Sequence, residues 1–299
     1  MIYYKVPATT ANMGPGFDSM GMALELYNKL GMEETGSGLE IKMQGIGSDT
    51  LPKDETNLCY KAAKYFFDKV NYPLKGLKIE IYNQIPIARG LGSSSSIIVG
   101  ALMCANEIAK TNFDKAQILN ISGEIENHPD NIAPAVMGGI VVGAVEKTQV
   151  LYKKVLPKDD LSAVCLIPNY ELKTEDARKI LPKNLERADT IYNISRTALV
   201  VLALQTGDYD LLTKACHDKL HQPYRKKLIK EYDAFMKITM ENGSIASFIS
   251  GSGSTLMSLC KKAEEQKIFN ELKTYFLEQD KNNMVKILKP QLDGAIKAN

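Results

Sequence analysis

A glycine- and serine-rich segment, PIARGLGSSSS at residues 86–96, carries the strongest chemical signal in this sequence. Glycines let a backbone approach a ligand closely, and the free N–H groups at the start of a helix attract an anion. The serines lead into a long apolar segment, SIIVGALMCANEIAK (96–110), which we expect to form a buried helix. The segment is therefore a candidate cradle for the phosphates of a nucleotide.

Loops of better-known types do not match this segment. A Walker A loop requires GK[ST] after its glycines, and a dinucleotide fold requires GxGxxG; neither pattern occurs here. A flexible linker is the plain alternative for a Gly/Ser tract, but a linker is not expected between a strand and an apolar helix. A serine hydrolase would need a GxSxG elbow, which is also missing. A phosphate-binding loop of another type is the favoured hypothesis.

Two further glycine-rich turns supply the context for this loop. They are VPATTANMGPGFDSMGMAL at 6–24 and ISGSGST at 249–255. With PIARGLGSSSS they resemble, in order and spacing, the three signature motifs of the GHMP kinase superfamily. ENHPDNIAPAVMGG (126–139), KTEDARKILPK (173–183) and LHQPYRKKLI (220–229) are similar to segments of the homoserine kinases within that superfamily. The resemblance extends from about Val6 to about Leu259.

The resemblance implies a fold and an activity. The fold is α+β in two domains: an N-terminal ATP-binding domain of the ribosomal protein S5 domain 2-like type at 1–157, and a C-terminal ferredoxin-like α/β substrate domain at 158–299. The activity is ATP-dependent phosphorylation of the side-chain hydroxyl of L-homoserine, a step of threonine biosynthesis. The alternative is another small-molecule GHMP kinase, acting on a mevalonate-pathway substrate or a sugar.

The resemblance also assigns residues to ATP and Mg²⁺. Phosphoryl transfer requires N–H donors, Mg²⁺ and a hydroxyl held in line. The metal ligands it implies are a serine hydroxyl and an acidic residue. Ser94 is the candidate serine, although which serine touches the metal stays open; Glu126 is the preferred acid and Glu124 the alternative. Asn57 corresponds to the position that contacts the base. The complete set expected to bind the nucleotide is Asn57, Pro86, Ile87, Ala88, Arg89, Gly90, Leu91, Gly92, Ser93, Ser94, Ser95 and Ser96.

A second set of residues is expected to bind the amino acid. Arg178 and Arg225 match the pair that holds its carboxylate, a task suited to the guanidinium fork. Asn12, Asp18 and Glu126 are the catalytic candidates, and whether any residue acts as a general base stays open. The expected substrate-binding residues are Asn12, Asp18, His128, Asp130, Asn131, Thr174, Arg178, Arg225 and Gly251.

Composition is compatible with a small-molecule enzyme. The 37 basic and 35 acidic residues leave a formal charge of +2, which does not favour a nucleic-acid or membrane partner. Five scattered cysteines without a CxxC pair argue against a disulfide framework and fit the cytoplasm. His217 and His221 form an HxxxH pair, but they lack the glutamate of HExxH and a third ligand, so we expect a structural role. The sequence leaves a homodimer open.

The elements that must position these residues follow from periodicity. Strands are expected at 2–6, 39–43, 78–82, 138–145, 162–168 and 284–289, with a hairpin formed by 245–250 and 254–259. Helices are expected at 57–70, 96–110, 114–127, 175–181, 187–207 and 264–279. The charged segment 152–160 is expected to contain the domain boundary, and Met13, Met20 and Met22 are expected to pack beside the first glycine turn.

Overall fold

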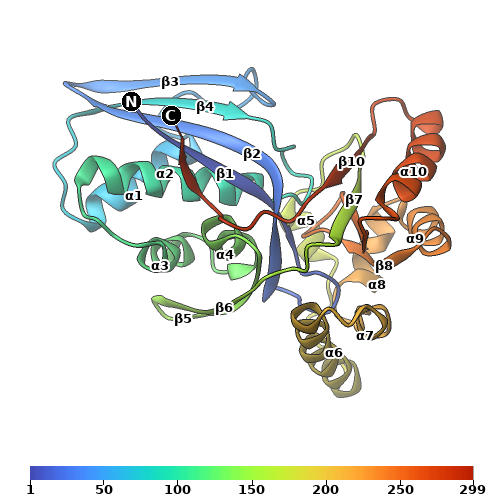
Figure 1. The fold of residues 1–299 in the computed structure, drawn as a ribbon. Helices are drawn as coiled ribbons and strands as arrows, with labels where there is room; N and C mark the ends of the chain where they lie inside the picture. Colours follow the sequence, from blue (N-terminus) through green and yellow to red (C-terminus); the bar gives the residue numbers. More distant parts are fainter. Residues whose placement is uncertain (299) are drawn as a thin grey trace.

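The computed structural model describes residues 1–298, which form two β-sheets with helices packed against them (Figure 1). The larger sheet has the neighbour order β11-β1-β2-β4-β3, and β5 joins β2 to β6. All its pairs are antiparallel except β3 with β4. Its strands are β1 (Ile2–Ala11), β2 (Met20–Thr35), β3 (Gly38–Gly45), β4 (Gly76–Asn83), β5 (Ile140–Glu146), β6 (Gln149–Val155) and β11 (Ile296–Ala298).

Four helices cover one face of this sheet (Figure 1). They are α1 (Leu58–Lys69), α2 (Ser93–Ala109), α3 (Lys115–Ile125) and α4 (Pro129–Met137). Helix α2 lies against β1 and β2, and its buried Leu102 shares a core with Phe66 of α1 and Ile79 of β4. The start of α3 is fixed by a capping box between Asp114 and Gln117. Helix α2, which begins with the serine run, thus lies in the core of this unit.

The smaller sheet is antiparallel, with the order β10-β7-β9-β8. A β-α-β-β-α-β chain order with this strand arrangement is ferredoxin-like, so the α+β prediction is confirmed. Its strands are β7 (Leu161–Ile167), β8 (Ser244–Ile249), β9 (Leu256–Lys261) and β10 (Met284–Leu288). The helices are α5 (Thr174–Lys179), α6 (Arg187–Thr206), α7 (Tyr209–Ala215), α8 (Gln222–Arg225), the 3-10 helix η1 (Lys226–Leu228), α9 (Tyr232–Glu241) and α10 (Glu265–Gln279).

One hydrophobic cluster joins the two units. Met20 and Met22 of β2 are buried in the same cluster as Cys165 of β7 and Met257 of β9. Met13, in the turn before β2, is also buried in it. The prediction that these methionines pack beside the first glycine turn is confirmed, and their flexible side chains fill the space between the two sheets.

Several predicted segments differ from the structure. Residues 20–35 form the long strand β2, which the glycine-rich pattern before it does not predict. Residues 149–155 form β6, although 152–160 is predicted to contain the domain boundary; an edge strand tolerates charges such as those of Lys153 and Lys154. Helices α4, α7, α8 and α9 and strand β11 are also absent from the prediction.

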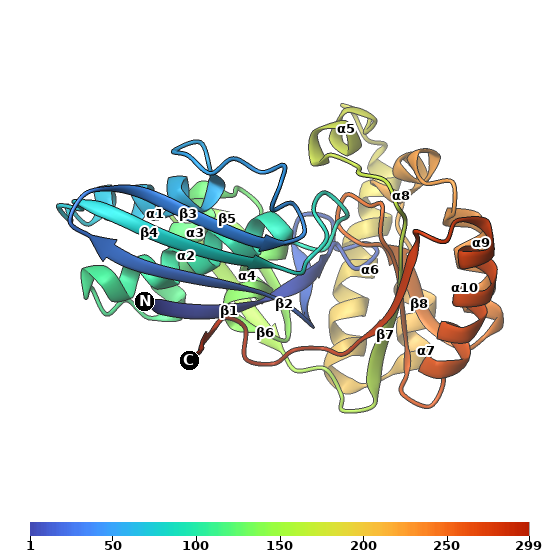
Figure 2. The same cartoon turned by 90° about the horizontal axis from the view of Figure 1, so that it is seen from above.

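The end of the chain leaves the second unit. After β10 the chain returns to the larger sheet, where β11 pairs with β1 (Figure 2). Residues 296–298 thus add a strand to the larger sheet, where β1 offers a free edge. The boundary at 157/158 stays a prediction. None of the helices within residues 1–298 is long and apolar enough to cross a membrane.

Candidate active site

A cavity of about 710 Å³ lies where the three glycine-rich turns meet. This volume is within the usual range for small-molecule sites. Almost all predicted site residues line it: Asn12, Asp18, Asn57, Pro86, Ile87, Ala88, Arg89, Gly90, Leu91, Gly92, Ser93, Ser94, Ser95, Glu126, His128, Asp130, Asn131, Thr174, Arg178, Arg225 and Gly251. Ser96 and Glu124 are not brought to the cavity. Residues far apart in the sequence thus form one site.

The loop before α2 is held by the other two turns. Thr9 donates its backbone N–H to Leu91 O at 3.1 Å, and Ser250 Oγ donates to Gly90 O at 2.6 Å. Gly90 and Gly92 both have positive φ, and a Cβ at Gly92 would lie 1.9 Å from Thr9 Oγ1. The glycine is therefore required by close packing against β1. Gly92 is also the N-cap of α2 and provides no side-chain cap, which leaves the first N–H groups of α2 available to an anion.

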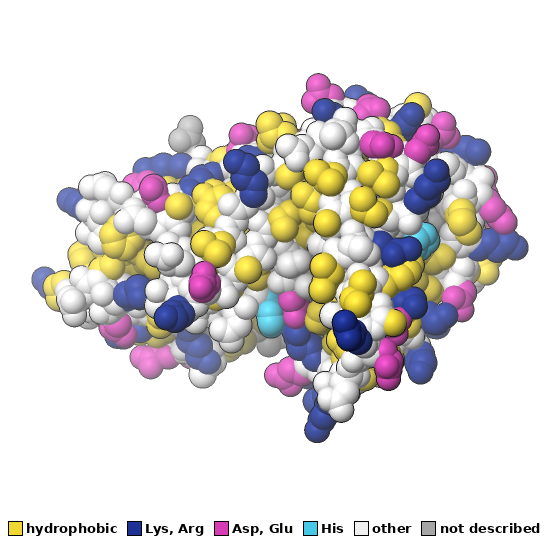
Figure 3. All heavy atoms as spheres, turned by 90° about the horizontal axis from the view of Figure 1, so that it is seen from below, with side chains coloured by type: hydrophobic (Ala, Val, Ile, Leu, Met, Phe, Trp, Pro, Cys, Tyr) yellow, Lys and Arg dark blue, Asp and Glu magenta, His cyan; other side chains and the backbone are white. Residues whose placement is uncertain are grey.

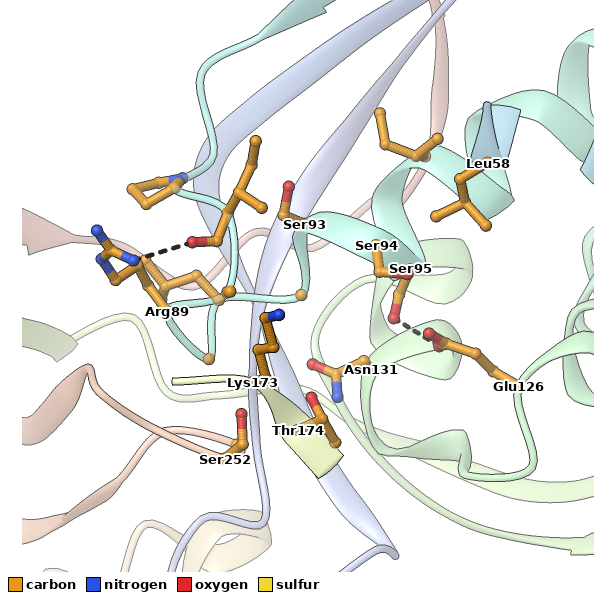
Figure 4. Close-up of a pocket in the computed structure, with 18 of the residues that line it drawn as sticks. Leu58, Arg89, Ser93, Ser94, Ser95, Glu126, Asn131, Lys173, Thr174 and Ser252 are labelled. Atoms are coloured by element: carbon orange, nitrogen blue, oxygen red, sulfur yellow. Dashed lines mark hydrogen bonds between the residues drawn. The ribbon is translucent and has the colours of Figure 1, made fainter. Parts of the chain in front are cut away.

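The four serines at the start of α2 point in different directions. Ser95 Oγ donates to Glu126 Oε2 at 2.6 Å, and both residues border the cavity with Ser93 and Ser94 (Figure 4). Ser96 is fully buried; its Oγ donates to Ser93 O and accepts from Asn28 Nδ2 on the core side of the helix. Ser96 is therefore not brought to the cavity, because a helix turns successive residues by about 100°, and its assignment to the nucleotide stays a prediction.

Glu126 and Glu124 also differ in position. Burial raises the pKa of Glu126, and hydrogen bonds from Ser95 and Ser94 oppose that rise. Glu124 instead accepts from Tyr65 Oη at 2.6 Å and pairs with Lys69 Nζ at 2.7 Å, outside the cavity. Of the two acidic residues left open by the sequence, Glu126 is the one beside the loop.

The end of the cavity where the nucleotide base is expected has more apolar side chains than the motifs indicate. Asn57 lines it, but its side chain is bound within the chain: Oδ1 accepts from Cys59 N at 2.9 Å and Nδ2 donates to Pro52 O at 2.6 Å. Asn57 is thus the N-cap of α1. Apolar residues surround this end, and sequence reasoning missed them because they share no motif: Met43, Leu51, Pro52, Leu58, Ile81 and Ile97.

The opposite end holds the residues expected to bind the amino acid. Arg178 binds Asp18 through both arms of its guanidinium group, at 2.8 and 3.0 Å. Asn12 Oδ1 accepts from Asp18 N at 3.0 Å, and Asn12 Nδ2 donates to Gly251 O at 2.8 Å. Gly251 O also accepts from Arg225 Nη1 at 3.0 Å. These contacts connect the first turn, α5, α8 and the turn after β8.

Phe17 lies beneath both arginines, a feature that sequence reasoning missed. The ring centroid is 5.7 Å from Arg178 Cζ and 5.1 Å from Arg225 Cζ. The ring also stacks on His221 at 5.1 Å, and His221 Nε2 lies 2.8 Å from Gly14 O. A guanidinium plane over an aromatic ring is favourable, so Phe17 provides a common support for the two cations. Its position directly before Asp18 was the available signal.

His221 is completely buried, whereas His217 is exposed. Within residues 1–298 there is no group of three His, Cys, Asp or Glu side chains arranged to hold a metal ion. His221 contacts Gly14 O and the Phe17 ring and so supports the first turn.

Charges of opposite sign are concentrated at this end. Burial, with the nearby carboxylates of Asp18 and Glu126, raises the pKa of Asp130 to about 7. Burial and repulsion by Arg178 lower the pKa of Arg225 to about 10. Burial also lowers the pKa of His128, whose Nδ1 lies 3.6 Å from Asp18 Oδ2. Several titratable groups with shifted pKa values around one cavity are typical of a functional site.

Known proteins match this chain along almost its whole length. Residues 57–139 match the GHMP kinases N terminal domain, and residues 200–278 match the GHMP kinases C terminal domain. A homoserine kinase of Clostridium botulinum (strain Alaska E43) is 45% identical over 99% of this chain and 98% of its own length. That of Clostridium kluyveri is 44% identical over 97% and 96%, respectively.

Solved structures agree with these matches. The crystal structure of homoserine kinase from Cytophaga hutchinsonii has a TM-score of 0.90 at 26% identity and covers 99% of this chain and 97% of its own. The mevalonate kinase of L. major shares the fold, at 16% identity and a TM-score of 0.72 over 96% of this chain and 95% of its own. The chain belongs to the homoserine kinase family of the GHMP kinases.

Proposed function

We propose that this protein transfers the γ-phosphoryl group of ATP to the side-chain hydroxyl of L-homoserine. The observation that carries the proposal is that Arg178 and Arg225 line the same cavity as residues 90–95, the glycine loop and the first turn of α2, here called the loop 90–95. Homoserine offers a carboxylate, an ammonium and a hydroxyl. The two guanidinium groups suit the carboxylate, and the carboxylate of Asp18 suits the ammonium. The relatives' names support the same substrate.

In the proposed reaction, the homoserine oxygen forms a bond to the γ-phosphorus while the bond from that phosphorus to the β,γ-bridging oxygen breaks. ADP carries away the electron pair of the broken bond, and the proton of the hydroxyl passes to the transferred phosphoryl group. Both oxygens of Asp18 are already engaged by Arg178, which disfavours this carboxylate as a general base. Positioning of the two substrates is then the main contribution of the protein.

The residues beside the loop fit a magnesium ion. Mg²⁺ is held in kinases by one or two carboxylates together with substrate phosphates and waters. Glu126 and the hydroxyls of Ser94 and Ser95 lie at the start of α2, where the phosphates are expected. We propose that Glu126 and Ser94 hold Mg²⁺, which when bound neutralises phosphate charge. Gly90, Gly92 and the first N–H groups of α2 would hold the phosphates.

A coupled assay of ADP release tests the function. The purified protein is offered homoserine, mevalonate, galactose and shikimate, with and without Mg²⁺. We expect Mg²⁺-dependent ADP release with homoserine and little with the other three. Equal turnover of a substrate without a carboxylate would contradict the proposal and favour another GHMP kinase activity.

We further propose a homodimer and a cytoplasmic location. Helix α6 exposes apolar side chains of Ile191, Ile194, Leu199 and Leu202 on one face of the molecule (Figure 3). An antiparallel pair of α6 helices about a two-fold axis would match Ile191 with Leu202 and Ile194 with Leu199 of the second copy. The five free, buried cysteines support a reducing compartment.

Light scattering during gel filtration tests the dimer. The wild-type protein should have twice the mass of one chain, and Ile194→Glu should elute as a folded monomer. The matched control, Tyr275→Glu, changes an exposed residue on α10 and should leave the mass unchanged. A monomeric wild-type protein at micromolar concentration would exclude this interface.

A further inference from the structure

Lys173 lines the cavity and belongs to none of the groups described above. It is the residue directly before α5 and borders the cavity together with Thr174 and Arg178. Its neighbour Leu172 donates its backbone N–H to Ala88 O at 2.9 Å, so this segment is joined to the phosphate loop. Figure 4 shows the Lys173 side chain extending toward the loop between Arg89 and Ser93.

The other cations of the cavity are already engaged. Arg178 binds both carboxylate oxygens of Asp18. Arg225 donates to Ala177 O and Gly251 O. Arg89 donates to Pro168 O and Ile87 O. Among residues 1–298, none makes a hydrogen bond or ion pair with the side chain of Lys173, which is exposed and free to meet a ligand.

The charges around the cavity create a need for such a cation. Asp18, Glu126, Asp130 and Glu175 all line it, and a nucleotide triphosphate adds more negative charge. In phosphoryl transfer, negative charge on the γ-phosphoryl oxygens must be neutralised where the acceptor hydroxyl attacks. Lys173 lines the same cavity as Arg178 and Arg225, and its side chain extends toward the loop expected to bind phosphates (Figure 4), so it is suited to meet that group.

We propose that Lys173 is a further catalytic residue, whose ammonium group contacts the γ-phosphoryl oxygens of ATP and holds them during transfer. The lysine keeps its proton throughout and forms no covalent bond. This inference rests on the proposed function, because it assumes that the loop 90–95 binds the triphosphate. It predicts that loss of the Lys173 side chain reduces the preference for a nucleotide that carries a γ-phosphate. The contacts that the loop and the two arginines make should be unchanged.

Binding measurements without turnover test the inference. Calorimetry compares the magnesium complexes of AMP-PNP and ADP on the wild type, Lys173→Ala and Lys173→Arg, with homoserine left out. We expect Lys173→Ala to lower the affinity for AMP-PNP by about 10-fold, as for loss of a charge-assisted hydrogen bond. The affinity for ADP should fall by less than about 2-fold. Lys173→Arg should recover most of the AMP-PNP affinity because the positive charge is kept.

Lys179→Ala is the matched control, since Lys179 is an exposed lysine at the end of α5, the helix that follows Lys173; it lies outside the cavity and pairs with Asp176. It should bind both nucleotides like the wild type. Steady-state kinetics should show a lower kcat for Lys173→Ala with an unchanged KM for homoserine. The inference would be overturned if Lys173→Ala lost equal affinity for AMP-PNP and ADP, or lost affinity for neither. It would also be overturned if the only kinetic change were a higher KM for homoserine.

These outcomes are separable from failure of the proposed function. If the wild type releases no ADP with homoserine but Lys173→Ala still loses AMP-PNP selectively, the substrate assignment is wrong and the γ-phosphate contact stands. If the wild type phosphorylates homoserine and Lys173→Ala is unaffected in both assays, only the role of Lys173 is wrong.

Discussion

Arg178 and Asp18 form a two-armed ion pair that links α5 of the second unit to the turn between β1 and β2 of the first. The Nη2–Oδ1 and Nη1–Oδ2 distances are 2.8 and 3.0 Å. A substrate carboxylate must therefore share Arg178 with Asp18 or draw it away, whereas Arg225 has no carboxylate partner in residues 1–298. The proposed binding site for the substrate carboxylate and the contact between the two units thus share one guanidinium group.

Removal of either arginine should impair use of homoserine selectively. A charge-assisted hydrogen bond is worth ~1.5–3 kcal/mol, so Arg178→Ala or Arg225→Ala should lower kcat/KM for homoserine ~10- to 100-fold. The ATP affinity should barely change. Because both residues would serve one ligand group, the double variant should lose less than the product of the two single losses. Steady-state kinetics with each substrate varied in turn measures these effects.

The controls for this prediction separate binding from stability. Arg225 is only 2% exposed and donates to two backbone carbonyls, so Arg225→Ala should also lower the Tm. Arg178→Ala should lower the Tm less, because its ion pair is partly exposed. Wild-type kinetics in both folded variants would remove the arginines from the substrate site.

Phe17 should act as a positioning residue for the two arginines. Phe17→Leu keeps an apolar side chain but removes the ring beneath both guanidinium groups, and we expect KM for homoserine to rise about 3- to 10-fold. Phe17→Tyr keeps the ring and should restore the wild-type KM. The KM for ATP should be unchanged in both. If Phe17→Leu and Phe17→Tyr raise the KM for homoserine equally, the ring does not act through the arginines.

Glu126 and Glu124 form a natural test pair for the metal site. Glu126→Gln should raise the Mg²⁺ concentration required for half-maximal activity and lower kcat, while the KM for homoserine changes little, because the carboxylate faces the loop. Glu124→Gln makes the same chemical change outside the cavity and should behave like the wild type. Titration of activity with Mg²⁺ gives the result. A larger effect of Glu124→Gln than of Glu126→Gln on the Mg²⁺ requirement would contradict the assignment of Glu126 to the metal.

Asp130 should make stability depend on pH. Its pKa is raised to about 7 in the folded protein from 3.8, so the folded state binds the proton more tightly than the unfolded state. Its contribution to the unfolding free energy is therefore complete below about pH 4 and is lost as the pH rises to about 7. Denaturant unfolding of wild type and Asp130→Asn at several pH values measures the difference. A difference that stays constant between pH 4 and pH 8 would contradict the prediction.

The sequence by itself determined most of the site and the outline of the fold. Motifs such as PIARGLGSSSS and ISGSGST depend on glycine geometry and local turns, which a short segment specifies without help from the rest of the chain. The helix of residues 93–109 and the hairpin of β8 and β9 follow from local periodicity in the same way. The family motifs then indicated which distant residues share the cavity.

Only the tertiary structure decided how those residues face one another. The helical rotation after Gly92 places Ser95 beside Glu126 and turns Ser96 into the core, although the four serines are identical in sequence. Packing of α5 and α8 around Phe17 brings two arginines 47 positions apart over one ring. The return of β11 to β1 depends on a free sheet edge. Long-range packing sets each of these, and no local pattern encodes it.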